Sequence, residues 1–225
     1  MELKVTAYAR NGHTDKFGIP RQSRDESPIL TRIVFEPEYR VAEALRGIEE
    51  FSHLWILWGF SEVDTWSPTV RPPRLGGNKR MGVFATRSPY RPNPIGLSSV
   101  QLVGIENGEL IVSGADVLDG TPIYDIKPYL SFSDSHEDAK NGFAEETKNR
   151  TLEVVLMPAQ NQHETSIRPA ENTVQEICYI LSQDPRPGYQ DDPEKEYKMD
   201  YSGYTVTFSV KENTVFVKNI EKNQK

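Results

Sequence analysis

The feature that most constrains the fold is a series of short apolar runs separated by closely spaced turns, extending to about residue 157. The clearest example is the stretch 98–115, in which alternating apolar residues flank an Asn107-Gly108 pair. An Asn-Gly pair between two alternating runs is a strong signal for a β-hairpin. The strand–helix alternation that builds parallel sheets is not found in this part of the sequence. The pattern therefore predicts a mainly β fold, either an antiparallel barrel or a sandwich.

Further apolar runs in the same region predict additional short elements. Strands are expected at residues 3–10, 32–36, 54–58 and 81–86, near Ile123 and at 151–156, and a short helix is expected at 41–50. The run 54–58, Leu-Trp-Ile-Leu-Trp, is almost wholly apolar and aromatic, which favours a buried central strand. Together these runs indicate a β domain over residues 1–157.

The remainder of the chain predicts a small α+β domain over residues 158–225. Residues 158–172 have weak periodicity and are interpreted as a linker. The next apolar residues follow the spacing of one helix face: Val174, Ile177, Cys178 and Leu181. Asn172 or Thr173 is the expected cap of this helix. Residues 204–217 predict a last hairpin, and a unit this small is not expected to be stable alone.

Several classes of protein are disfavoured by composition and by missing motifs. The single cysteine, Cys178, excludes an intramolecular disulfide and a thiolate metal cluster, and suits a reducing compartment. No run is long enough to span a membrane, and the N-terminus lacks the apolar segment of a signal peptide, so a soluble cytoplasmic protein is expected. The sequence has no Walker A, G-x-G-x-x-G or G-x-S-x-G motif, and its four histidines are scattered, so no metal is expected.

The charge distribution is uneven along the chain. The formal net charge is −7, yet residues 65–105 contain no Asp or Glu. This stretch holds six basic residues, Arg71, Arg74, Lys79, Arg80, Arg87 and Arg91. A locally basic face is an electrostatic footprint for phosphates, whereas the simpler interpretation is chance clustering on a solvated surface. The prolines and glycines between these residues favour the footprint because they hold the charges in a defined shape.

Four stretches have compositions that suit a binding site. They are residues 18–22, residues 71–77 with 86–96, residues 116–129 and residues 183–189. Arginine binds carboxylates and phosphates through two parallel contacts when its backbone is held, and proline provides that rigidity. Carboxylates within 116–129 could accept hydrogen bonds from ribose hydroxyls or from an amine. The structural alternatives are a rigid loop, ordinary turn chemistry and a helix stop.

A family resemblance rests on several of these motifs, which occur in the family's order over almost the whole chain. They are Pro20-Arg21-Gln22, Phe51-Ser-His-Leu-Trp-Ile-Leu, Arg71-Pro-Pro-Arg-Leu-Gly-Gly-Asn, Gly82-Val-Phe-Ala-Thr-Arg-Ser, Arg91-Pro-Asn-Pro-Ile-Gly, Asp119-Gly-Thr-Pro-Ile, Asp125-Ile-Lys-Pro-Tyr and Asp184-Pro-Arg-Pro. The sequence resembles the TrmO (YaeB-like) tRNA methyltransferases. The resemblance implies a single-sheeted antiparallel β-barrel with a small C-terminal domain, assembled as a homodimer. It also implies methyl transfer from S-adenosylmethionine to the exocyclic N6 of threonylcarbamoyladenosine, just 3′ of the tRNA anticodon.

The resemblance also implies roles for individual residues. Cofactor contacts are expected at Pro20, Arg21, Gln22, Ser61, Glu62, Arg87, Leu97, Asp116, Val117, Leu118 and Asp119. Candidates near the reacting atoms are Asp125, Lys127 and Tyr129, with no basis for choosing between them. Phosphates of tRNA are expected at Arg71, Arg74, Lys79, Arg80, Arg91 and Arg186.

The stretch 86–99 is interpreted as a rigid junction between cofactor and tRNA. Arg87 directly follows the expected strand and should face the cofactor, where it could bind a carboxylate. Arg91, four residues later, should face the substrate, and the alternative is that it is a structural clip held by a local carboxylate. Two other functions remain open: a non-catalytic nucleic-acid binding module, which would not explain the acidic stretch 116–129, and a phosphate-handling enzyme, which would need no S-adenosylmethionine.

Overall fold

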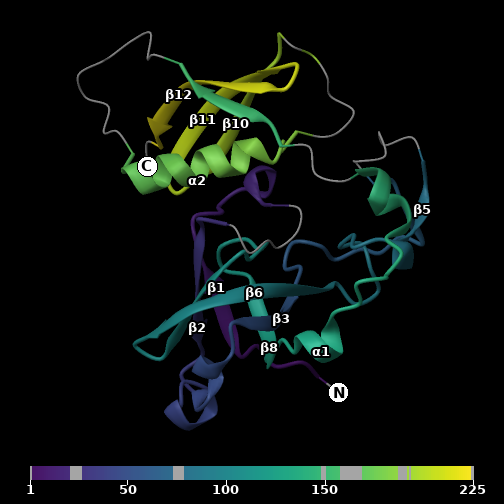
Figure 1. Cartoon of the computed structure of the whole chain (residues 1–225), viewed down its shortest axis with the longest axis vertical. Coiled ribbons are helices and arrows are strands. Elements are labelled where there is room, and N and C mark those ends of the chain that lie inside the picture. Colours follow the sequence, from purple (N-terminus) through teal and green to yellow (C-terminus); the bar gives the residue numbers. More distant parts are fainter. Residues whose placement is uncertain are drawn as a thin grey trace.

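The protein is a β-barrel joined to a second unit of one helix and one sheet (Figure 1). The computed structural model describes residues 2–20, 27–72, 79–147, 151–157, 169–186, 192 and 194–223. In Figure 1 the barrel forms the lower half, the helix-and-sheet unit the upper half, and a short two-stranded arm extends to the right at β5.

Six strands close the barrel in the order β1-β2-β7-β6-β3-β8. Their bounds are Ala7–Arg10 (β1), Leu30–Phe35 (β2), His53–Gly59 (β3), Ile95–Glu106 (β6), Glu109–Ser113 (β7) and Pro122–Pro128 (β8). Every neighbouring pair is antiparallel, and the pair β1–β8 completes the closure. The prediction of a mainly β, antiparallel barrel is therefore confirmed, and the sandwich alternative is not.

The hairpin predicted at 98–115 is also confirmed, as β6 and β7. Asn107 and Gly108 form its turn with φ angles of 53° and 78°. Both angles lie in the left-handed region, which the tight two-residue hairpin turn requires and which Asn and Gly adopt most readily.

The barrel interior is filled from alternate positions of each strand. On β3, Leu54, Ile56 and Trp58 point inward and are buried, whereas Trp55 and Leu57 point outward and are partly exposed. The strand expected at 54–58 is therefore present but buried on one face only. A closed barrel has a single interior, so a wholly apolar run must present half of its side chains outside.

Two expected elements take a different form. The helix expected at 41–50 is a pair of 3₁₀ helices, Ala42–Leu45 and Ile48–Glu50, because Gly47 between them has φ 85° and interrupts any continuous helix. The strand expected at 81–86 is only Met81–Gly82 (β5), which pairs with Thr69–Val70 (β4) to form the arm. The chain then turns into a 3₁₀ helix over Val83–Ala85.

The second unit contains a four-stranded sheet in the order β10-β11-β12-β9, covered by helix α2. Its elements are Glu153–Leu156 (β9), Glu171–Ser182 (α2), Glu196–Tyr201 (β10), Tyr204–Lys211 (β11) and Thr214–Lys222 (β12). The last hairpin is confirmed as β11 and β12. The strand expected at 151–156 pairs in parallel with β12 and so belongs to this sheet, not to the barrel.

Helix α2 begins slightly earlier than expected. Its N-terminal cap is Ala170, with no capping side chain, and not Asn172 or Thr173. Ile177 and Leu181 of the predicted apolar face are buried in the core of this unit, and Cys178 is half-buried beside them. Burial raises the pKa of the Cys178 thiol, which suits a packing role.

The segment that follows β1 joins the two units. Phe17, in the 3₁₀ helix Lys16–Gly18, stacks on Tyr197 of β10 with ring centroids 6.5 Å apart. Ile29 is buried in the core of the C-terminal unit although it directly precedes β2. The backbone N–H of Ser202 donates to the carbonyl of Gly12 at 2.9 Å. The C-terminal unit is therefore packed against a loop of the barrel.

The remaining described helices are short. They are Ser131–Asp134 (α1) and the 3₁₀ helix Gly142–Thr147 (η6). Among the helices that the structure describes, none has both the length and the apolarity needed to cross a membrane.

Candidate active site

A cavity of about 550 Å³ lies where β3 ends and β6 begins. Its walls come from five segments that are distant in the sequence: the end of the loop after β1, the residues that follow β3, the stretch 86–91, the start of β6 and the turn after β7. The lining includes Pro20, Trp58, Glu62, Arg87, Leu97 and Asp116. Barrel closure brings these segments together, because β3, β6 and β7 present these ends on the same side.

One wall of the cavity is organised by a hydrogen-bonded chain of three side chains. Trp58 Nε1 donates to Ser98 Oγ at 2.9 Å, and Ser98 Oγ donates to Asp116 Oδ1 at 2.5 Å. Since the indole N–H can only donate, the Ser98 hydroxyl must use its own proton on the carboxylate. The Trp58 ring lies directly against Gly96, where any Cβ would overlap it. The arrangement fixes the position of the Asp116 carboxylate at the cavity.

An ion pair connects two of the segments that line the cavity. Lys16 Nζ lies 2.5 Å from Glu62 Oε2, and both residues line the cavity. The hydrogen bond that Lys16 donates to the Glu62 carboxylate raises the pKa of Lys16. Both side chains are more than half exposed, so this pair positions the loops more than it stabilises the fold.

Most of the expected cofactor residues are brought together here. Those that line the cavity are Pro20, Ser61, Glu62, Arg87, Leu97, Asp116, Val117 and Leu118. Asp119 does not line it: its carboxylate lies 3.6 Å from Arg10 and accepts from the backbone N–H of Asn11. Arg21 and Gln22 lie outside the residues that the structure describes.

The three candidates for the reacting centre lie elsewhere, on the outer face of β8 and just after it. Asp125 pairs with Lys127 at 2.7 Å and also accepts from the backbone N–H of Ile126. The Tyr129 ring packs on Trp55 with centroids 5.4 Å apart. Trp55 lines the cavity, but Asp125, Lys127 and Tyr129 do not. The structure therefore places them beside a wall of the cavity without bringing them into it.

The residues expected to hold tRNA fall into two groups. Arg71 and Arg80 line a second depression of about 1200 Å³, and Lys79 is exposed next to Arg80. Arg74 lies outside the described residues. Arg186 is 6% exposed and makes a two-pronged contact with Asp184 at 2.8 and 3.0 Å, so its guanidinium is engaged within its own loop.

Arg91 is also engaged locally, in place of the expected outward orientation toward substrate. Its Nη1 donates to the carbonyls of Val83 and Thr86 at 3.2 and 2.8 Å, and its guanidinium lies 5.5 Å from the centre of the Phe84 ring. The Val83 carbonyl also accepts from the backbone N–H of Thr86 at 3.1 Å and from the Thr86 hydroxyl at 2.9 Å, so Arg91 adds to a hydrogen-bonded turn. Arg91 therefore clips the turn that carries Arg87, and it also lines the cavity.

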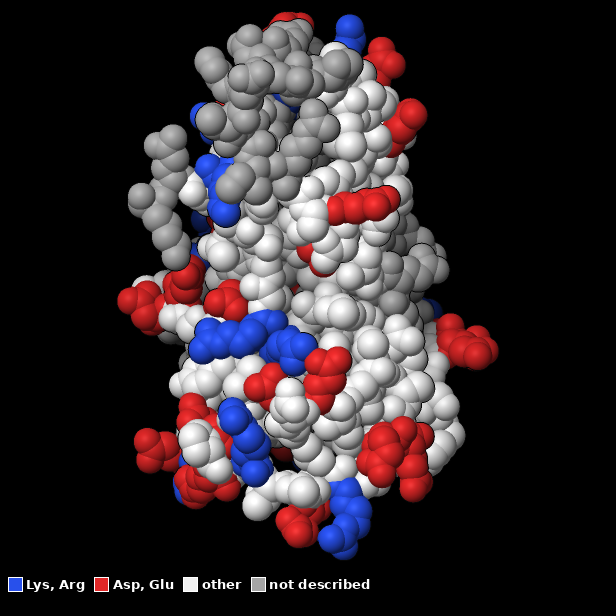
Figure 2. Space-filling model, turned by 90° about the vertical axis from the view of Figure 1, so that its left-hand side faces the viewer, with Lys and Arg blue, Asp and Glu red and all other residues white. Residues whose placement is uncertain are grey.

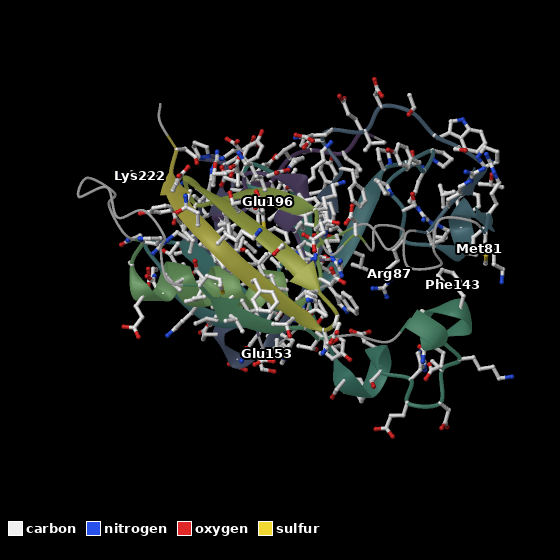
Figure 3. The ribbon with its side chains drawn as sticks, turned by 90° about the horizontal axis from the view of Figure 1, so that it is seen from above. Met81, Arg87, Phe143, Glu153, Glu196 and Lys222 are labelled. Atoms are coloured by element: carbon white, nitrogen blue, oxygen red, sulfur yellow. The ribbon has the colours of Figure 1, made fainter. Side chains whose placement is uncertain are left out.

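Arg87 lies on the wall that the cavity and the second depression share. Figure 3 shows Arg87 and Phe143 on the same side of the molecule, toward the arm at Met81 and away from the Lys222 end of the C-terminal sheet. Among the described residues, no group of three or more His, Cys, Asp or Glu could hold a metal ion.

Several residues of the cavity are not among those expected from the sequence. Trp58 and Ser98 lie in ordinary strand positions, and only the β3–β6 register makes them neighbours. Lys16 and Tyr90 also line the cavity. Tyr90 lies within the motif 86–96, so the sequence did contain a signal for it.

Comparison with known proteins gives a consistent family. Residues 8–135 match the model of the tRNA-methyltransferase O N-terminal domain, and residues 149–223 match the model of the TrmO C-terminal domain. The chain is similar to a crystal structure of TrmO from Pseudomonas aeruginosa, with a TM-score of 0.80 and 32% identity over 99% of this chain and 97% of that one.

Two curated relatives agree with this match. A tRNA (adenine(37)-N6)-methyltransferase of Escherichia coli is 40% identical over 84% of this chain and 83% of its own length. One from Eikenella corrodens is 45% identical over 76% of this chain and 97% of its own length. The barrel, its cavity and both matched regions lead to one conclusion: the chain belongs to the tRNA-methyltransferase O family.

Proposed function

We propose that this protein transfers a methyl group from S-adenosylmethionine to N6 of the tRNA adenine at position 37. The observation that carries this proposal is the cavity at the barrel end, with an arginine and a fixed carboxylate, in a chain whose two halves match the family. Its relatives include tRNA (adenine(37)-N6)-methyltransferases and proteins assigned to S-adenosylmethionine binding. They favour a methyltransferase over a non-catalytic RNA-binding module or a phosphate-handling enzyme.

The cavity suits S-adenosylmethionine in size and chemistry. Its volume of about 550 Å³ is within the usual range of small-molecule sites, and its walls are mostly apolar with a few polar groups. Arg87 would bind the carboxylate of the methionine moiety, and Asp116 would accept from ribose hydroxyls or from the amino group. Leu97 and Trp58 would provide apolar contact. Arg21 and Gln22 keep their expected cofactor roles as a proposal.

S-adenosylmethionine supplies a methyl group that its sulfonium already activates. The residues of the chain therefore have mainly to align donor and acceptor and to exclude water. If the adenine carries a threonylcarbamoyl group, as the sequence resemblance implies, its N6 is amide-like and must lose its proton. Asp125, Lys127 and Tyr129 remain the candidates for this step. They could act on a base that reaches past Trp55 to the outer face of β8.

Other features of the assembly are proposals as well. The barrel and the helix-and-sheet unit would form two domains, with the boundary before β9 because β9 pairs with β12. We also propose a homodimer in the cytoplasm. Light scattering should then give twice the 25.6 kDa mass of the chain, and a single-chain mass at micromolar concentration would contradict the dimer.

Calorimetric titration with S-adenosylmethionine tests the cofactor site. We expect Asp116→Asn to weaken binding by about one to two decades, because a hydrogen bond to a charged group contributes about 1.5–3 kcal/mol. Asp119→Asn is the matched control, since Asp119 lies in the same turn but outside the cavity. Absence of binding by the folded wild-type protein would overturn the proposed function. Equal affinities for the two variants would remove Asp116 from the site.

A further inference from the structure

We propose that the depression beside the cofactor cavity is a stacking surface for unpaired bases of the tRNA anticodon loop. We call it the aromatic groove. Its lining includes Trp66, Arg71, Arg80, Phe84, Arg87, Tyr90 and Phe143. The inference rests on the proposed function, since it states how the same enzyme would hold the nucleotides that flank its target base.

The groove and the cavity are continuous along one wall. Both are lined by Thr86, Arg87, Pro89 and Tyr90. An RNA strand lying in the groove would therefore place the next nucleotide at the entrance of the cofactor cavity. This geometry matches a reaction in which one base of a loop is modified while its neighbours are bound.

The wall that carries the groove is held in shape by backbone contacts. The N–H of Ser67 donates to the carbonyl of Tyr90 at 3.2 Å, and the N–H of Val83 donates to that of Pro68 at 3.0 Å. The arm strands β4 and β5 pair between these contacts. The hydrogen bonds from Arg91 to the carbonyls of Val83 and Thr86 hold the turn that follows β5. The aromatic residues are thus presented by a fixed scaffold.

Three aromatic side chains of the groove are unusually exposed. Trp66 is 57% exposed, Phe84 75% and Tyr90 47%. Exposed apolar side chains that gather in one place indicate a binding surface, because burying them is favourable. Unpaired RNA bases are commonly bound by stacking on aromatic side chains and on arginine planes. The groove offers both kinds of surface.

The charges of the groove fit a polyanion. Among the described residues, Arg71, Arg80 and Arg87 have no acidic partner within 4.0 Å, although Arg32 pairs with Glu106 and Lys218 pairs with Glu196. Arg80 is oriented by its contact with the Thr69 hydroxyl at 2.8 Å. On the far side of the molecule from the arm, Figure 2 shows blue and red side chains interspersed.

Another part of the groove lining comes from Phe143 and Ala144 of η6 and from Asn141 just before it. Asn141 Nδ2 donates to the carboxylate of Glu145 at 2.7 Å, so this part carries an acidic group. The RNA phosphates should therefore follow the arginine wall. A second copy of the chain is the main competing occupant, and the experiment distinguishes it.

The test compares Trp66→Ala, Trp66→Phe and Arg80→Ala with Phe132→Ala, a control that is 86% exposed on α1 and outside the groove. Dissociation constants for unmodified and modified tRNA are measured at several salt concentrations, together with S-adenosylmethionine affinity and mass by light scattering. We expect Trp66→Ala to raise the tRNA dissociation constant about 5- to 100-fold, with Trp66→Phe close to wild type. Cofactor affinity and mass should not change.

Salt dependence separates stacking from charge. Trp66→Ala should leave the slope of log affinity against log salt unchanged, whereas Arg80→Ala should reduce it by about 0.7, the value for one contact on a single strand. Phe84→Ala provides a second stacking variant if Trp66→Ala does not fold.

Three results would overturn the inference. Unchanged tRNA affinity in Trp66→Ala and Phe84→Ala, with wild-type methylation intact, would reject the groove and leave the proposed function standing. A drop in mass on substitution would show that the groove is an interface between two copies. If the folded wild-type protein transfers no methyl group to tRNA, the proposed function fails, and the inference that rests on it fails too.

Discussion

At the scale of single residues, the cavity depends on one hydroxyl that serves two neighbours. Ser98 accepts from Trp58 and donates to Asp116, and it is 2% exposed. Asp116 could be expected from the sequence because it lies in an acidic turn with a family motif. Ser98 and Trp58 could not, because hydrophobic alternation shows that they face inward but does not show which inward residues meet.

Ser98→Ala should therefore affect both stability and binding. The substitution leaves the buried Trp58 N–H without its acceptor, which costs about 1–3 kcal/mol of unfolding free energy. It also frees the Asp116 carboxylate to move, so affinity for S-adenosylmethionine should fall. Denaturant unfolding and calorimetry measure the two effects. Ser99→Ala, which changes the adjacent outward-facing serine, should change neither, and equal results for both variants would contradict the role given to Ser98.

His13 provides a second residue-scale prediction. Its imidazole is 1% exposed, neither ring nitrogen has a hydrogen-bond partner among the described residues, and burial lowers its pKa to about 4. An unfolded chain binds this proton with a pKa near 6.5, so protonation favours unfolding as the pH falls from about 6.5 to about 4. The contribution of His13 to stability is present above that window and lost below it.

We expect His13→Leu to remove this pH dependence. The difference in unfolding free energy between wild type and variant should shift by about 3 kcal/mol, in favour of the variant, between pH 7 and pH 4. Urea unfolding at a series of pH values measures it. If the unfolding free energies of the two proteins changed with pH in parallel, His13 would not be held neutral by the fold.

At the scale of elements, the sequence predicted those elements whose conformation depends on the backbone preferences of a few adjacent residues. Asn107 and Gly108 identified a hairpin because their backbone preferences alone favour its turn. Gly47 interrupts the expected helix at 41–50 with a left-handed φ of 85°, a conformation that glycine permits but does not require. The strand β10 alternates polar residues with Tyr197, Met199 and Tyr201, the pattern of a strand buried on one face, although no strand was expected there.

The turn after β5 depends on a contact that the sequence cannot reveal. Residues 81–86 look like one strand, but the chain bends at Val83. Arg91, eight residues further on, donates to the carbonyls of Val83 and Thr86. From the sequence, Arg91 could face tRNA or be held by a local carboxylate, and its partners in the structure are backbone carbonyls.

Arg91→Ala should consequently disorganise the turn that carries Arg87. We expect a lower melting temperature and weaker binding of both S-adenosylmethionine and tRNA, because the wall shared by cavity and groove loses its support. Arg80→Ala is the matched comparison, since Arg80 lies on the arm but makes no contact with these carbonyls in the described structure. Thermal melting measures the stability of each variant, and titrations with S-adenosylmethionine and with tRNA measure the two affinities. If Arg91→Ala weakened only tRNA binding, Arg91 would instead be a residue of the tRNA-binding surface.

At the scale of the whole molecule, the barrel and the C-terminal unit share a tightly packed joint. Gly12 lies against the ring of Tyr201, whose hydroxyl donates to Glu176 of α2 at 3.0 Å. The family resemblance implied a small second domain, and the helix and hairpin were visible in the sequence. The joint was not, because it depends on a loop before β2 that enters a core formed almost wholly by residues after 150.

Gly12→Ala should weaken this joint. An added Cβ would come within 2.7 Å of the Tyr201 ring, which has little room to move because it is 1% exposed. Overpacking of this kind costs about 1–3 kcal/mol. Gly104→Ala, with no atom within 4 Å of the added Cβ, is the control. Denaturant unfolding measures the cost, and equal stability of the two variants would show that the joint yields easily.

The central claim is methyl transfer to tRNA, and mass analysis of nucleosides tests it most directly. Unmethylated tRNA is incubated with the wild-type protein and S-adenosylmethionine carrying an isotopically labelled methyl group, and is then digested to nucleosides. We expect the label on N6 of the adenosine at position 37, in its threonylcarbamoyl form, with a much lower yield from Asp116→Asn. A folded protein that binds the cofactor but leaves the tRNA unlabelled, or places the label on another nucleoside, would contradict the account.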